Sequence, residues 1–142
     1  GSNSNTMSWW ILEGVAELAT ETVSPKSRQR VNAAVTRWAE EDNLAPWDDI
    51  TTFGSVPRRF MGHVYTQGHH FMGWLSEKYG RTKRNAWLTH MSRSTTKEPG
   101  PLLDEATRAI FAMSWDDLSQ AWRADLPWPK PAAPTEPVEQ VN

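Results

Sequence analysis

The stretch VYTQGHHFMGWLSEKYG, residues 64–80, predicts one long helix with a defined end. The helix is expected to begin near Arg59 or His63 and to run to Tyr79, where Gly80 follows as a C-terminal cap. Gly68 lies inside this helix, where glycine costs about 1 kcal/mol relative to alanine. Such a cost is tolerated where a second backbone must come close.

Helical patterns also lie on both sides of this stretch. Predicted helices cover residues 8–22, 24–41, 82–91, 102–113 and 114–126, with loops at 43–58 and 94–101. Ser24-Pro25 and Ser114-Trp-Asp-Asp117 are typical helix starts, since a hydroxyl side chain can cap the first turn. No segment favours a strand. The sequence therefore predicts an all-α fold, a bundle of five or six helices.

The domain organisation follows from composition. Residues 1–7 resemble a cloning tag or a disordered lead-in, and residues 8–126 form the expected helical subdomain. Five of the sixteen residues from 127 to 142 are proline, and the segment offers little apolar surface to bury. We expect this last segment to be a disordered tail or linker that makes few contacts.

Charge and length exclude several classes of function. The 142 residues carry a net charge of −2, so no strongly basic surface indicates a nucleic-acid partner. No apolar run approaches the ~20 residues that span a bilayer. Cysteine is absent, which removes disulfides, thiolate metal sites and thiol nucleophiles and leaves the redox compartment undetermined.

Tryptophan is unusually abundant, with nine residues against two tyrosines and four phenylalanines. This content predicts a hydrophobic core built largely from large aromatic side chains. The alternative is a surface for carbohydrate or for a protein partner. The inward stripes of the predicted helices give the expected buried residues: Trp10, Leu18, Val35, Trp38, Phe71, Trp74, Leu75, Trp87, Ile110, Trp115 and Trp122.

The four histidines alone do not predict a metal site. His63 and His70 are two helical turns apart, a spacing more typical of surface or capping residues than of zinc ligands. The HExxH pattern, which would be specific for zinc, is absent from the sequence. A Ser-His-Asp arrangement cannot be inferred from it, and no glycine-rich phosphate loop is present.

Two stretches taken together carry a resemblance. WWILEGVAE, residues 9–17, and residues 64–80 resemble the second half of the catalytic domain of gluzincin zinc metallopeptidases, the peptidase-MA-like group that includes zinc aminopeptidases. The family pattern W-x-x-E-G-x-A matches Trp10, Glu13, Gly14 and Ala16. Its later Y-x-x-G pattern, followed by an apolar helix ending in Y-G, matches the 64–80 stretch. Residues 102–126 look like the closing helices of the family, so the resemblance covers roughly residues 9–126.

The resemblance implies roles for particular residues. Glu13 would be the third zinc ligand, held in place by flanking tryptophans, and Tyr65 would stabilise the oxyanion formed during peptide hydrolysis. His69 or His70 would line the substrate cleft, and His63 is a weaker candidate. Zinc is the implied cofactor of the intact parent protein and a peptide is its substrate.

The sequence departs from the family pattern at one point. The HExxH helix should precede Glu13, yet the twelve residues before Glu13 contain no histidine. We therefore expect the chain to be a fragment whose partner is a missing HExxH-bearing part, and we expect no tightly bound zinc and no activity from this chain alone. Two other readings remain open. One is a helical interaction module without enzymatic activity that derives from the same fold, and the other is a plain helical bundle in which Glu13 faces water.

Overall fold

The computed structural model describes residues 3–19 and 26–130. They form six α-helices and contain no strand, so the prediction of an all-α bundle of five or six helices is confirmed. The helices are α1 (Trp9–Ala19), α2 (Lys26–Glu40), α3 (Met61–Tyr79), α4 (Arg81–Arg93), α5 (Pro99–Phe111) and α6 (Trp115–Ala124). Short 3-10 helices lie at Ser4–Thr6, Trp47–Ile50 and Arg58–Phe60.

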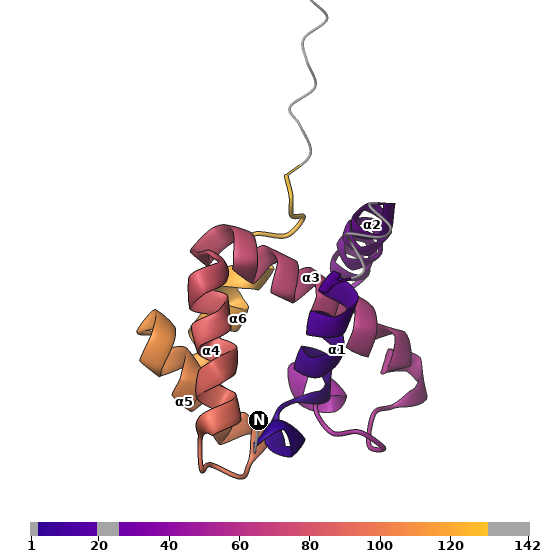
Figure 1. Ribbon diagram of the computed structural model, residues 1–142. Helices are drawn as coiled ribbons and strands as arrows, with labels where there is room; N and C mark the ends of the chain where they lie inside the picture. The colour runs from indigo at the N-terminus through magenta and orange to yellow at the C-terminus, as the bar shows by residue number, and fades with distance from the viewer. Residues whose placement is uncertain (1–2, 20–25, 131–142) are drawn as a thin grey trace, which may run out of the picture.

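Helix α3 organises the bundle. It packs against α1, α2 and α4, and its residues from Gln67 to Leu75 are all buried. Figure 1 shows α3 running across the molecule, with α1 crossing it and α4 leading away from its C-terminal end. The helix stops where the sequence predicts, because Gly80 adopts a φ of 94°, a conformation that favours glycine.

The core consists largely of aromatic rings. Trp10 is fully buried, with its ring centroid 4.2 Å from that of Trp47, 5.3 Å from Phe71 and 5.6 Å from Trp115. Seven of the eleven residues expected inside are buried: Trp10, Val35, Phe71, Trp74, Leu75, Trp87 and Trp122. The other four are partly buried and pack against this core: Leu18, Trp38, Ile110 and Trp115. All nine tryptophans are buried or partly buried, which supports a core role over an exposed carbohydrate surface.

Two helix starts show where sequence patterns succeed and fail. Ser114 caps α6, its Oγ accepting a hydrogen bond from the Asp117 amide at 3.0 Å, as the sequence predicts. Helix α5 begins at Pro99, within the segment expected to be a loop. Proline is accommodated there because the first helical residue needs no backbone N–H partner. The predicted start at Ser24-Pro25 lies outside the described residues.

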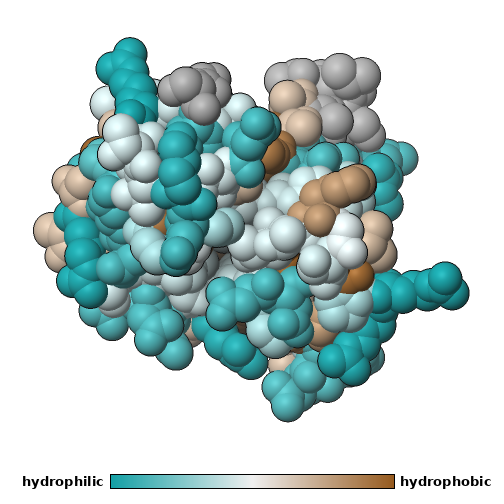
Figure 2. All heavy atoms as spheres, turned by 90° about the horizontal axis from the view of Figure 1, so that it is seen from below, coloured by the Kyte–Doolittle hydropathy of each residue, from teal (hydrophilic) through white to brown (hydrophobic). Residues whose placement is uncertain are grey.

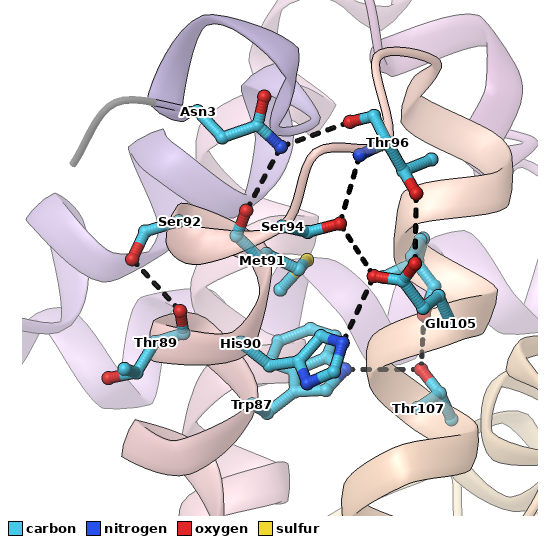
Figure 3. A network of polar contacts seen from close by, with 11 residues as sticks. Asn3, Trp87, Thr89, His90, Met91, Ser92, Ser94, Thr96, Glu105 and Thr107 are labelled. Atoms are coloured by element: carbon cyan, nitrogen blue, oxygen red, sulfur yellow. Dashed lines mark hydrogen bonds and ion pairs between the residues drawn. The ribbon is translucent and has the colours of Figure 1, made fainter.

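Residues 3–7 differ from the predicted tag or disordered lead-in, because they belong to the folded domain. Asn3 is 1% exposed, and its side-chain amide donates to the backbone oxygens of Met91 (3.1 Å) and Thr96 (3.0 Å). Lys97 Nζ donates to Asn3 Oδ1 at 2.7 Å. Met7 is also buried. These residues therefore hold the end of α4 and the loop after it (Figure 3).

The same loop is fixed on its other side by one carboxylate. Glu105 of α5 accepts hydrogen bonds from Ser94 Oγ (2.7 Å), Thr96 Oγ1 (2.8 Å) and His90 Nε2 (3.0 Å) (Figure 3). These donors lower the pKa of Glu105, the Ser94 hydroxyl contributing most. The network joins α4 to α5 and is structural.

The C-terminal boundary also differs from the prediction. Trp128, placed by the sequence in the tail, is partly buried and packs against the core. Its backbone oxygen accepts a hydrogen bond from His70 Nε2 at 2.8 Å. The folded domain therefore extends beyond residue 126. The rest of the expected tail, residues 131–142, lies outside the described residues.

Candidate functional site

Helices α1 and α3 cross with their backbones in contact. A Cβ atom built on Gly68 would lie 2.4 Å from the Trp10 backbone oxygen, and one on Gly14 would lie 2.6 Å from the Gly68 oxygen. Neither distance leaves space for a side chain. Both positions therefore require glycine for close approach, as we expected for a glycine inside a helix.

Glu13 lies beside this crossing on the stripe of α1 that includes Trp9. The carboxylate is partly buried, and its Oε1 accepts a hydrogen bond from Trp9 Nε1 at 2.9 Å. Trp9 is itself only 9% exposed, so the donor is held firmly. Within the described part of the chain no second partner binds this carboxylate, and its other oxygen is available to a ligand. Trp9, which the motif alone does not single out, thus orients the Glu13 carboxylate.

Tyr65 contacts the same tryptophan from α3. The Tyr65 ring meets Trp9 edge to face, with centroids 5.9 Å apart, and the residue is 37% exposed. Its hydroxyl has no hydrogen bond to any described residue. Because Glu13 and Tyr65 both touch Trp9, the fold places the two predicted site residues around one ring. Phe53 also meets Trp9 edge to face at 4.9 Å and is 77% exposed.

His70 points away from this ring towards α6. Its Nδ1 accepts a hydrogen bond from Trp122 Nε1 (3.0 Å), and its Nε2 donates to the Trp128 oxygen (2.8 Å). Burial lowers the pKa of His70 to about 4, so the ring is neutral at pH 7. Both ring nitrogens are used inside the fold, which favours a structural role over substrate binding.

His69 and His63 occupy two further environments. His69 is buried and lines a hollow of about 290 Å³ with Glu17 and Thr66, between α3 and the start of α2. His63 stacks on Trp38 with ring centroids 3.7 Å apart, and its Nε2 bonds to the Asn43 oxygen at 2.8 Å. Burial lowers the pKa of His63. The three histidines of α3 therefore do not converge on Glu13.

The described residues contain no group of three or more His, Cys, Asp or Glu side chains placed to hold a metal ion. Glu13 thus offers one carboxylate, whereas a catalytic zinc has three protein ligands. None of the helices in residues 3–19 and 26–130 is long and apolar enough to cross a membrane.

Comparisons with protein-family models, with curated proteins and with solved structures give no significant match. The functional assignment therefore has to come from the residues themselves.

Proposed function

We propose that this chain is the C-terminal helical part of the catalytic domain of a gluzincin-like zinc metallopeptidase. In this proposal Glu13 is a zinc ligand and Tyr65 stabilises the oxyanion. The other ligands and the general base come from an HExxH-bearing part that this sequence lacks. One observation carries the proposal: Trp9 donates to the Glu13 carboxylate and packs against the Tyr65 ring.

The environment of Glu13 suits a metal ligand. A carboxylate that binds zinc is commonly hydrogen-bonded on its outer side, which fixes its orientation. Trp9 Nε1 supplies such a bond at 2.9 Å and leaves the second carboxylate oxygen free for the metal. A bound zinc ion would supply Lewis-acid activation of water for attack on a peptide carbonyl. The part played by this chain is to hold the Glu13 carboxylate in one rotamer.

Tyr65 suits the role of a neutral hydrogen-bond donor. Its hydroxyl is unpaired among the described residues, and the exposed part of the side chain can face a substrate. A phenol placed against a developing negative charge stabilises the transition state more than the ground state, an effect worth up to about 3–4 kcal/mol in comparable oxyanion sites. The edge contact with Trp9 fixes the ring while the hydroxyl stays accessible.

Exposed apolar side chains lie next to Trp9. Leu12, 39% exposed, and Phe53, 77% exposed, line one hollow together with Trp9. Seen from below, polar side chains cover most of the molecule and the apolar ones appear in small groups between them (Figure 2). Exposed large apolar residues around a polar group are typical of a surface that a further segment covers. In this proposal that segment is the HExxH-bearing part.

The same exposed residues favour a second candidate, a helical interaction module without activity. Phe53 carries this alternative because a side chain that is 77% exposed favours a protein contact whether or not zinc binds nearby. The reading frame upstream of residue 1 separates the two candidates. An HExxH about 20–30 residues before Glu13 would support the peptidase.

The chain alone is expected to bind zinc weakly and to cleave no peptide, because one carboxylate falls short of three positioned ligands. Isothermal titration of residues 1–142 with zinc, and assays on mixed peptides, measure both properties. Tight one-to-one binding that survives Glu13→Ala would contradict the proposal, since the metal would then sit elsewhere.

A further inference from the structure

A groove separate from Glu13 and Tyr65 lies between α1 and α4. It has a volume of about 420 Å³, within the range of small-molecule sites. Its apolar lining consists of Val15, Leu18, Ala19, Met72 and Leu88. A second hollow of about 310 Å³ shares Val15 and Leu88 and extends towards Ser4 and Met7, so apolar surface continues along α1.

One end of the groove is strongly cationic. Among the described residues, Arg28, Arg81 and Arg84 line it together with one carboxylate, that of Glu77. Glu77 pairs with Arg28 at 3.7 Å, and the described lining of the groove holds no second carboxylate for Arg81 and Arg84. The first turn of α4 contains no acidic residue that would offset them. Two guanidinium groups near each other with no counter-charge favour an anionic ligand.

Arg84 is held in place for such a ligand. Its Nη1 donates to Ser76 Oγ at 2.8 Å, while Nε and Nη2 donate to Asn85 Oδ1 at 3.2 and 3.1 Å. Three of its five N–H groups are used in these bonds, so two remain for a ligand. Burial, and then the charge of Arg81, lower the pKa of Arg84, as expected for a cation whose charge is not compensated. Arg81 makes no hydrogen bond or ion pair within the described chain.

We propose that this groove binds a carboxylate attached to an apolar chain, with the carboxylate between Arg81 and Arg84. The apolar chain lies over Leu18, Met72 and Leu88. Cations at one end and apolar side chains along the floor match an amphiphile with a negative head, and they disfavour a cationic one. A medium-chain fatty acid and a peptide ending in apolar residues share this chemistry. The groove contains neither predicted site residue, so the inference does not depend on the proposed function.

Titration calorimetry on the 142-residue chain tests this inference with decanoate, butanoate and decyltrimethylammonium. Decanoate is expected to bind, and butanoate much more weakly because it lacks the apolar chain. The cation should not bind measurably. Acetyl-Leu-Leu, with a free carboxylate, is the second arm. Tighter binding of decanoate indicates a fatty acid as the natural ligand, and tighter binding of the dipeptide indicates a peptide C-terminus.

Two matched variants locate the carboxylate. Arg81→Gln is expected to weaken decanoate binding about fivefold or more, since one charge-assisted hydrogen bond is lost. Lys83→Gln removes the same charge from an exposed position on α4 outside the groove lining and should leave the affinity unchanged. Equal effects of the two variants would overturn the inference. So would equal binding of the cationic amphiphile, or no binding of either carboxylate up to its solubility limit.

Discussion

Gly68→Ala is expected to lower the free energy of unfolding by about 2–4 kcal/mol, because overpacking a close backbone contact outweighs the higher helix propensity of alanine. The added Cβ would lie 2.4 Å from the Trp10 backbone oxygen. A rigid backbone cannot yield as a flexible side chain can, so α1 must move away from α3. Urea unfolding followed by tryptophan fluorescence measures the change.

Two alanine variants on the same helix provide controls. Gly62 has nothing within 4 Å of its added Cβ, so Gly62→Ala should be neutral or stabilising by up to about 1 kcal/mol. Gly73→Ala should have an intermediate effect because the Cβ would meet only the guanidinium of Arg28, at 2.8 Å. If Gly68→Ala were as stable as Gly62→Ala, the two backbones would not be in contact at Gly68. The contact of both Glu13 and Tyr65 with Trp9 would then lose its basis.

Acid should destabilise the fold well above the pH at which most carboxylates titrate. The ordinary pKa of histidine is 6.5, and burial lowers that of His70 to about 4. Between these values the unfolded chain binds a proton that the folded chain does not. The contribution of His70 to stability is therefore full above about pH 6.5 and is lost as the pH drops towards 4, with a total loss of about 3 kcal/mol from this group. His63 contributes in the same direction because its pKa is also lowered.

His70→Asn tests this assignment. The asparagine side chain has no proton to gain, and its amide oxygen can still accept from the Trp122 indole. The variant should be less stable than the natural chain at about pH 7.5, since the bond to the Trp128 oxygen is lost, but its stability should depend much less on pH. Urea unfolding midpoints at about pH 7.5 and about pH 4.5 measure how strongly stability depends on pH. An unchanged pH dependence would assign the titration to other groups.

Sequence patterns predicted the helices better than their surroundings. Gly80 and Ser114 act through local geometry, so the end of α3 and the start of α6 could be predicted from neighbouring residues alone. Asn3 and Trp128 could not, because their partners lie far away in the chain: Asn3 binds Met91, and His70 binds the Trp128 oxygen. The residues that neighbour Asn3 and Trp128 in the sequence do not indicate such long-range contacts.

The candidate site shows the same limit. Glu13 could be singled out through the resemblance of its surrounding motif, and Gly68 through the cost of glycine in a helix. The separation of His69 from His70 could not, because adjacent residues on a helix point about 100° apart and only the packing decides what each one meets. His70 faces Trp122, whereas His69 lines a hollow with Glu17. The role of Trp9 as the donor that holds Glu13 likewise depends on a rotamer that no sequence pattern specifies.

The proposed function places Glu13 in a longer protein with an HExxH-bearing part, and the zinc affinity of that protein is the decisive measurement. The measurement compares the unmodified protein with Glu13→Gln and with Glu40→Gln, which changes an exposed glutamate on α2. We expect one tightly bound zinc per chain, an affinity lower by about a hundredfold or more in Glu13→Gln, and no change in Glu40→Gln. Equal affinity of Glu13→Gln and the unmodified protein, or no zinc binding by the complete protein, would contradict the proposed function.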